Sequence, residues 1–278
     1  MQVLPSLDLS ATIKHYLFLT TQSEEVKKLR LFSDGNTGMV FSFKTPLISH
    51  FAGSGIRVEL PDSFIYGQLD SFQDLYCQGE TSLMIVVFHP HGLSQILGIP
   101  SQELKNQRIK AEDLFGSKGT ALYEKLSDST AITSKITLAE DFFRKLIASR
   151  QLPDQPLILA SLNFITQNKG LLPVSKLAAF TGYHERTLER TFITNIGISP
   201  KRFSTIVKLH VFLKQLRDQP IQETLTLLGH EAGYYDQPHL IREFKKHTGL
   251  TPGQYSSIAD PLAINFLSYQ PGQHGLLT

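Results

Sequence analysis

The residue types that most often perform chemistry in proteins are sparse in this sequence and poorly grouped. His89 and His91 flank a proline and look like part of a metal site, but no further cluster of Cys, His or carboxylate residues stands at ligand spacing. A turn at the end of a strand is the simpler interpretation of this segment. Cys77 follows Leu75 and Tyr76, and a lone cysteine among apolar residues is more often a small core residue than a redox sensor.

Motifs that mark common enzyme classes do not occur in the sequence. Gly53-Ser-Gly55 is not a phosphate-binding loop, because no Gly-Lys-Ser or Gly-Lys-Thr follows it. No Gly-x-Ser-x-Gly nucleophile elbow is found either. We therefore expect a protein that is not an enzyme and that has no cofactor and no bound metal.

Two segments in the last third of the chain repeat one another. At an offset of 51 residues, the matched positions are Leu177, Ala178, Gly182 and Tyr183 with Leu228, Gly229, Gly233 and Tyr234. After a slip of one residue, the offset of 52 matches Leu188, Arg190, Phe192, Gly197, Pro200 and Phe203 with Leu240, Arg242, Phe244, Gly249, Pro252 and Tyr255. So many matched positions with one slip indicate a duplicated structural unit.

Each unit has the pattern of a helix-turn-helix. The expected helices are Val174–Phe180 and 184–195 in the first unit, and Thr224–Glu231 and 236–247 in the second. Gly182 and Gly233 occupy the turns, where glycine adopts a positive φ without strain. The second helix of each unit has apolar residues four positions apart as a buried stripe, and Asp236 is placed to cap the later one. Ser199-Pro200 and Thr251-Pro252 each start a further helix.

The outward face of each second helix has side chains that suit the edges of DNA bases. These residues are His184, Arg186, Glu189 and Arg190 in the first unit, and Gln237, His239, Ile241 and Arg242 in the second. Arg binds guanine through two hydrogen bonds, Glu accepts from cytosine, Gln pairs with adenine and Ile packs on the thymine methyl. Candidates for phosphate contacts are Lys201, Lys245 and Lys246, and such contacts position a protein without specifying sequence. Positively charged residues on a helix are also common on a solvated surface that contacts no DNA. Arg190 has a second interpretation, as a partly structural residue.

One long helix, from Pro200 to about Gln219, is expected to join the two units. At roughly 1.5 Å per residue it is on the order of 30 Å long. The major groove returns to the same face of B-DNA about every 34–36 Å. A connector of this length therefore places both second helices in successive grooves of one duplex, without a second copy of the chain.

These residues resemble the DNA-binding domain of the AraC-type transcription regulators. The resemblance runs from Leu157 to Ser257 and rests on the duplicated Leu, Gly, Arg-x-Phe and Ser/Thr-Pro positions given above. It implies a domain of seven helices in an activator or repressor. It also implies that the base-reading residues are Arg186, Glu189, Arg190, Gln237, His239 and Arg242. Gly229, Tyr234 and Leu240 depart from the usual residues of the family, so we expect the second unit to read DNA less stringently than the first.

The first 98 residues have the pattern of short strands and turns. The expected strands are Lys14–Thr21, Leu29–Phe32, Met39–Phe43, Phe64–Gly67 and Leu83–Phe88. Asp34-Gly35-Asn36 is turn chemistry, and the continuous apolar run Leu83–Phe88 is typical of a strand buried on both faces. The spacing predicts a small β-barrel or sandwich. Its layout is similar to the cupin-like sensor or dimerisation domains attached to AraC-type regulators.

From Ser101 the pattern becomes helical, which makes the fold class α+β with several domains. Leu104–Phe115 and Leu122–Leu126 are expected helices, and Leu138, Phe142 and Leu146 repeat every four residues on one helix face. Two prolines make residues 151–156 a linker, and no strand is expected after it. The predicted division is a sensor or dimerisation domain over 1–150, a DNA-binding domain over 157–258 and a tail over 259–278.

Composition sets outer bounds on these interpretations. The chain has 278 residues, 41% hydrophobic and 19% charged, which is ordinary for a globular protein with two domains. Lys and Arg number 15 against 16 Asp and Glu up to residue 150, and 12 against 9 beyond it, a weak gathering of positive charge. One cysteine fits a reducing compartment, and neither a membrane span nor a secretory signal is seen. We expect a cytoplasmic location.

The main hypothesis is a bacterial regulator that binds double-stranded promoter or operator DNA. Its N-terminal domain then senses a small-molecule effector or forms a homodimer, and an activator also contacts RNA polymerase. Two alternatives stay open. Either a cupin-like enzyme or metal-binding protein carries the DNA-binding module as an accessory, or the N-terminal domain mediates protein–protein contact alone.

Overall fold

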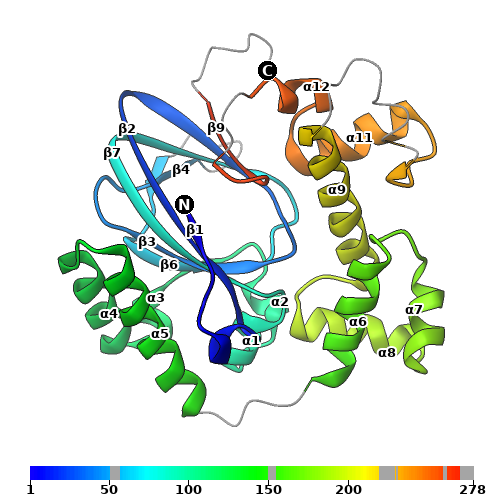
Figure 1. Cartoon of the computed structure of the whole chain (residues 1–278), viewed down its shortest axis with the longest axis horizontal. Coiled ribbons are helices and arrows are strands. Elements are labelled where there is room, and N and C mark those ends of the chain that lie inside the picture. Colours follow the sequence, from blue (N-terminus) through cyan, green and yellow to red (C-terminus); the bar gives the residue numbers. More distant parts are fainter. Residues whose placement is uncertain (51–56, 150–154, 219–228, 230, 259–261, 270–278) are drawn as a thin grey trace.

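The structure is a computed structural model that describes residues 1–50, 57–149, 155–218, 229, 231–258 and 262–269. Figure 1 shows a strongly curved sheet with helices beneath it, beside a row of helices from the second half of the chain. Gly53-Ser-Gly55, residues 151–154 of the expected linker and most of the expected helix Thr224–Glu231 lie outside the described residues.

The first half of the chain forms an antiparallel sheet, as the spacing predicts. The strands are β1 (Gln2–Val3), β2 (Ile13–Leu31), β3 (Thr37–Ser42), β4 (Ile48–His50), β5 (Arg57–Glu59), β6 (Ser63–Tyr66), β7 (Gln73–Phe88), β8 (Arg108–Lys110) and β9 (Phe266–Tyr269). Their order is β1-β2-β7-β3-β6-β8, with β4 on β5 and β7, and β9 on β2. A short 3-10 helix, η1 (Leu7–Leu9), connects the first two strands.

Lys14–Thr21 and Leu29–Phe32, expected as two strands, belong almost wholly to one strand, β2. It pairs with β7 from Ile13 to Leu31, with a register shift between Ser23 and Lys27. The intervening residues Glu24 and Glu25 are exposed. Their polarity made this part of the strand look like a loop, because alternation disappears where neither face is buried.

The apolar run Leu83–Phe88 is buried on both faces, which confirms its prediction. Because successive side chains of a strand point to opposite faces, Met84, Val86 and Phe88 belong to one hydrophobic cluster and Leu83, Ile85 and Val87 to another. The first cluster lies between the sheet and the helices. The second lies on the concave side of the sheet.

Five helices follow the sheet in the N-terminal half. They are α1 (Gly92–Leu97), α2 (Ser101–Leu104), α3 (Ala111–Phe115), α4 (Ser117–Asp128) and α5 (Ile132–Ala148). The expectation of one helix over Leu104–Phe115 is wrong, because this segment contains β8, whose Ile109 pairs with Ile65 at the sheet edge. The α5 prediction is confirmed, although the fully buried positions are Ala139 and Phe143.

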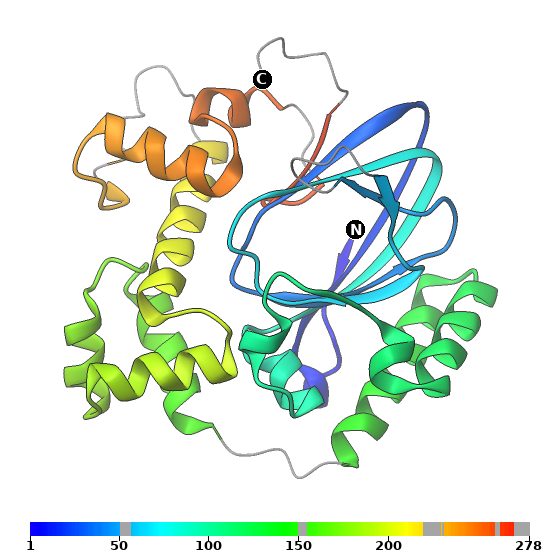
Figure 2. The same ribbon diagram turned by 180° about the vertical axis from the view of Figure 1, so that it is seen from behind.

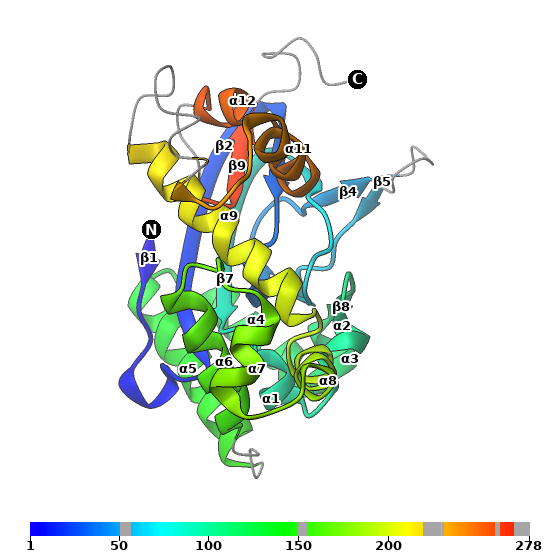
Figure 3. The ribbon, with the colours of Figure 1, turned by 90° about the vertical axis from the view of Figure 1, so that its right-hand side faces the viewer.

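The second half is a row of helices around a long connector. The helices are α6 (Pro156–Gln167), α7 (Val174–Thr181), α8 (Glu185–Asn195), α9 (Pro200–Asp218), α11 (Gln237–Thr248) and α12 (Pro252–Ser256). Figures 1 and 3 show α6, α7 and α8 around one end of α9, with α11 and α12 around its other end. The bounds of α9 confirm the prediction of a long connector from Pro200 to about Gln219. No described helix is long and apolar enough to cross a bilayer.

The expectation that no strand follows residue 156 is wrong. Phe266–Tyr269 forms β9, which pairs antiparallel with Lys28–Leu31 of β2. Four residues are too short a run to identify a strand from sequence, and this strand exists because a distant edge is available to pair with it. Figure 2 shows the last described part of the chain returning to the sheet, so both halves of the molecule share it.

Candidate nucleic-acid interface

The first helix-turn-helix is built as its sequence predicts. Helix α7 ends at Gly182, which adopts φ 75° and whose N–H donates to the carbonyl of Ala178. A β-carbon would be strained in this conformation, so the turn favours glycine. Leu177, Leu188 and Phe192 are all buried, and they hold α7 and α8 together.

The outward face of α8 carries side chains without partners among the described residues. Arg186, Glu189 and Arg190 are exposed, and none of their side chains has a hydrogen bond or ion pair to another described residue. His184 is the N-cap residue of α8 and is also exposed. Two cations and a carboxylate on an unpartnered helix face are able to donate to and accept from base edges.

The second helix-turn-helix has the same construction. Gly233 lies at the turn with φ 77°. The Asp236 carboxylate caps α11 by accepting from the backbone N–H of His239 at 2.7 Å, which confirms the predicted cap. A β-carbon on Gly229 would lie 3.1 Å from Leu240 Cδ2, so the small residue belongs to a close helix crossing. Leu240 and Phe244 are fully buried.

The base-reading candidates of α11 differ in exposure. Gln237 and Arg242 are exposed, whereas His239 is half-buried and its ring packs 5.8 Å from that of Tyr234. His239 is therefore partly a structural residue. Lys208, which the sequence analysis missed, donates to the Gly233 carbonyl at 3.0 Å and lies over the Tyr234 ring. Lys208 lies on α9, 25 positions before Gly233, so no local sequence pattern predicts this contact.

Both predicted helix starts are capped, and the three candidates for phosphate contacts are exposed. Ser199 Oγ accepts from the Arg202 N–H at 3.1 Å, and Thr251 forms a capping box with Gln254. Lys201 is exposed in the first turn of α9, whereas Lys245 and Lys246 are exposed in the last turn of α11. Cations in a last turn also stabilise the helix dipole, so these two lysines have a second physical reason for their position.

Both second helices are attached to the N-terminal half by their C-terminal ends. The hydroxyls of Ser94 and Ser101 donate to the Asn195 carbonyl, each at 2.8 Å. At the equivalent end of α11, Arg30 Nη1 donates to the Gly249 carbonyl at 3.1 Å. The first turns of α8 and α11 consequently lie on the side away from the sheet, as Figure 1 shows.

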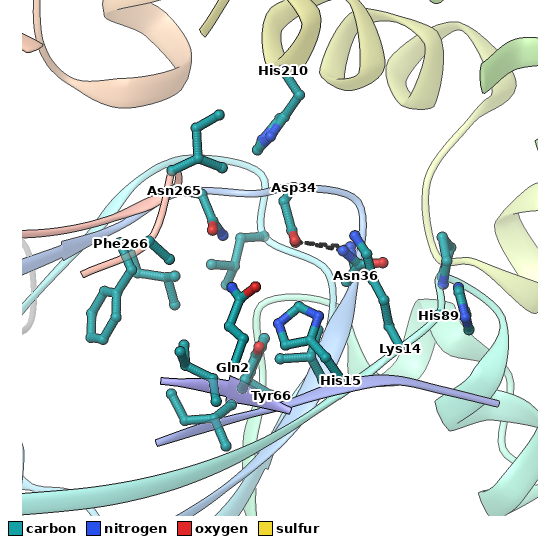
Figure 4. A pocket seen from close by; sticks show the side chains of 18 of the residues that line it. Gln2, Lys14, His15, Asp34, Asn36, Tyr66, His89, His210, Asn265 and Phe266 are labelled. Atoms are coloured by element: carbon teal, nitrogen blue, oxygen red, sulfur yellow. Dashed lines mark hydrogen bonds between the residues drawn. The ribbon is translucent and has the colours of Figure 1, made fainter. Parts of the chain in front are cut away.

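A cavity of about 1070 Å³ lies between the concave side of the sheet, α6, α9 and the β9 segment. Apolar side chains of its sheet wall include Leu17, Val40, Leu83 and Ile85, while Phe266 of β9 contributes from the other side. Figure 4 shows polar side chains meeting at one end of it. The concave side of the sheet is therefore hollow, which the strand pattern alone did not indicate.

The polar end of the cavity is organised around Asp34. Its carboxylate accepts from the backbone N–H of Asn36 at 3.1 Å and from Asn36 Nδ2. Burial alone raises the pKa of Asp34, but Lys14 and the hydrogen bonds from Asn36 outweigh it and lower that pKa. Burial lowers the pKa of His210, which faces Asp34 from α9 (Figure 4). Asp34 is thus ionised and His210 neutral near pH 7.

The two histidines and the cysteine that could perform metal or redox chemistry lie in ordinary structural environments. His89 and His91 lie in the turn between β7 and α1, as expected, with their rings stacked 6.2 Å apart. Within the described ranges, no three His, Cys, Asp or Glu side chains gather closely enough to hold a metal ion. Cys77 is buried in the concave-side cluster, and burial raises the pKa of its thiol, which makes it less reactive.

Two domain families match parts of the chain. A domain of unknown function matches residues 1–110, and a helix-turn-helix domain matches residues 177–257. The second match covers the duplicated unit described above. This match identifies residues 177–257 as a helix-turn-helix domain. An uncharacterized HTH-type transcriptional regulator of Haemophilus influenzae is 29% identical over 104 residues, which cover 37% of this chain and 34% of that protein. The chain thus matches about a third of this relative's length.

Solved structures of ToxT from Vibrio cholerae are similar to the helix-turn-helix domain together with the N-terminal half. One covers 87% of this chain and 97% of ToxT with a TM-score of 0.50 at 7% identity. Another, an apo form of a ToxT variant, covers 88% and 98% with a TM-score of 0.50 at 10% identity. At these identities the similarity shows a shared fold, an N-terminal sheet with helices followed by a helical domain.

Proposed function

We propose that this protein is a sequence-specific DNA-binding transcription regulator. Helices α8 and α11 enter successive major grooves of one duplex, and the N-terminal domain responds to a small molecule. The observation that supports this most is the common orientation of the two recognition helices. Both have their C-terminal ends on the N-terminal domain and their first turns away from it. The N-terminal residues of recognition helices are the ones that reach base edges.

The contacts divide into two classes in this proposal. The base-reading residues are Arg186, Glu189 and Arg190 on α8, and Gln237, His239 and Arg242 on α11. Lys201, Lys245 and Lys246 contact phosphates. The half-buried ring of His239 makes α11 the less exposed reader, which supports a dominant role of α8 in specificity.

Selection of DNA from a random-sequence library by the full chain tests this function. We expect a site with two conserved segments about one helical turn apart, and protection of both segments in a footprint. Uniform weak binding that depends only on salt would contradict sequence-specific recognition. Homodimerisation and contact with RNA polymerase stay hypotheses, which sedimentation of the full chain and transcription from the selected site test.

The lining of the cavity favours one chemical class of small-molecule effector. Much of its sheet wall is apolar, and its charged lining residues are Lys14, Arg108, Lys214 and Arg217 against the single carboxylate of Asp34 among the described residues. An extended apolar molecule with one anionic group satisfies both features. Because the lining comes from the sheet and from α9, such a molecule contacts both domains at once.

Thermal unfolding with a series of alkyl carboxylates of increasing chain length tests the effector site. Ligands that bind the folded state raise the melting temperature, and we expect the rise to grow with chain length. The variant Lys14→Met tests the anionic group, because it removes a lining cation that has no ion pair in the described part of the chain, and it should reduce the rise. A rise that is equal for carboxylates and for the corresponding neutral alcohols would contradict an anionic ligand.

A further inference from the structure

Strand β9 contacts two separate hydrophobic cores with adjacent side chains. Phe266 belongs to the cluster on the concave side of the sheet and lines the cavity. Leu267 is fully buried in the core of the second helix-turn-helix unit, together with Phe244 and Leu240. Successive side chains on a strand point to opposite faces, so this short strand joins the cavity wall to the second unit.

The strand is attached at both of its sides. Its backbone pairs with Lys28–Leu31 of β2. Just before it, the Asn265 carbonyl accepts from the Phe32 N–H at 3.1 Å, and Asn265 Nδ2 donates to the Phe32 carbonyl at 3.0 Å. From the DNA-binding side, the Tyr255 hydroxyl donates to the Ile264 carbonyl at 2.9 Å. Both domains therefore hold the same segment.

The cores of the two helix-turn-helix units differ in who supplies them. The first core consists of residues from α6 to α9, although two of them, Leu162 and Phe203, also line the cavity. The second core includes Phe32, which directly follows β2, and Leu267 of β9, both fully buried. The Phe32 ring packs 6.5 Å from the Tyr255 ring and 6.2 Å from that of His210. The second unit is thus completed by residues outside it.

We infer that β9 is a two-sided strap through which the N-terminal domain and its cavity determine the order of the second helix-turn-helix unit but not of the first. A molecule that fills the cavity presses on Phe266 and shifts β9 against β2. Leu267 moves with it, because the two residues are neighbours on one strand. The second core then changes its packing, because Leu267 is one of its members. The effect on DNA reading rests on the proposed function, whereas the effect on folding does not.

Hydrogen exchange of the full chain tests the folding part of this inference. We expect Leu267→Ala to increase exchange in α11 by at least about tenfold and to leave α8 unchanged. The matched control is Ile158→Ala, in the first core, which should increase exchange in α8 and leave α11 unchanged. If Leu267→Ala does not fold, Asn265→Ala removes one anchor of the strap without emptying a core. Equal changes in α8 and α11, or an unchanged α11, would overturn the inference.

Footprints on the site selected by the wild-type chain test the reading part. Leu267→Ala should lose protection of one of the two segments and keep the other, whereas Ile158→Ala should lose the opposite segment. If the wild-type chain selects no site, the proposed function fails while the exchange experiment still decides the strap. If Leu267→Ala protects both segments as the wild type does, the strap has no role in reading DNA.

The cavity part needs a probe, and anilinonaphthalene sulfonate combines apolar rings with one anionic group. Its binding to the wild-type chain should change exchange in α11. The sequence has no tryptophan, so Phe266→Trp adds a unique fluorophore whose emission reports whether the probe reaches β9. Binding that alters the Trp emission but leaves α11 exchange unchanged, or no binding at all, would contradict coupling through the strap.

Discussion

At the scale of single residues, Arg186 and Lys201 represent the two proposed kinds of DNA contact. The Arg186 side chain, on α8, has no partner among the described residues and suits a guanine edge. Lys201 is exposed at the start of α9 and is the proposed contact to the DNA phosphates. We expect Arg186→Ala to reduce affinity for the selected site by about 1–3 kcal/mol and to relax specificity at one base pair.

The matched variant is Lys201→Ala, which should weaken binding to all sequences alike and flatten the salt dependence of the binding constant. Both quantities come from titrations of specific and scrambled DNA at several salt concentrations. If the two variants lose affinity and specificity in the same way, the division into base and phosphate contacts is wrong.

His247 makes the stability of the protein depend on pH. Burial, followed by the charge of Arg202, lowers its pKa from 6.5 to about 4. Arginine has donors only, so Arg202 Nη1 donates to Nε2 of a neutral His247 at 3.1 Å. Since the unfolded chain binds this proton at a higher pH than the folded one, stability is present above about pH 6.5 and is lost as the pH falls toward 4.

We expect His247→Gln to reduce this acid sensitivity. Urea unfolding at pH 7 and pH 5 should give a smaller loss of unfolding free energy for the variant, by about 1–2 kcal/mol. His91, His210 and other buried histidines contribute in the same direction, so part of the dependence should stay. An identical loss in both proteins would contradict a neutral, buried His247.

At the scale of elements, the turn glycines position the recognition helices. Gly182 has φ 75°, a conformation that strains any residue with a β-carbon. Apart from its chain neighbours, no described residue lies within 4 Å of the position that a β-carbon would take, so a substitution causes strain without a clash. We expect Gly182→Ala to destabilise the protein by about 1 kcal/mol. Gly253→Ala is the control, because this glycine lies within α12 with equally open space and no positive φ. It should be neutral or stabilising by up to about 1 kcal/mol, as measured by urea unfolding.

The elements also show which sequence signals are reliable. Helices α8, α9 and α11 lie within one or two residues of their expected bounds, because caps, glycine turns and four-residue spacing are local features. The strands at residues 108–110 and 266–269 were missed. Each has three or four residues, and each exists only through pairing with a distant edge.

At the scale of the whole molecule, Arg30 connects the two domains. Its guanidinium makes two hydrogen bonds to Asp74, at 2.6 and 2.7 Å, and a third to the Gly249 carbonyl. The side chain is buried, so its removal takes this donor from the Gly249 carbonyl and leaves Asp74 with its ion pair to Lys28. We expect Arg30→Met to lower the free energy of unfolding by about 3 kcal/mol.

The control for Arg30 is an exposed ion pair of the same sheet. Lys44 and Glu80 lie 3.6 Å apart with about half of each side chain exposed. Lys44→Ala should change the unfolding free energy by about 0.5 kcal/mol or less. Similar losses for both variants in urea titrations would show that Arg30 does not join the domains.

The sequence by itself determined the two helix-turn-helix units, their connector and the candidate reading residues. Their signals lie within a few residues of one another: a glycine at Gly182, a cap at Asp236, a buried stripe at Leu188 and Phe192. Only the tertiary structure decided that the sheet is hollow and that the second unit borrows Phe32 and Leu267. These features depend on contacts such as that between Phe32 and Asn265, which are 233 positions apart. No local pattern encodes such a pair, because its two residues meet only in the tertiary structure.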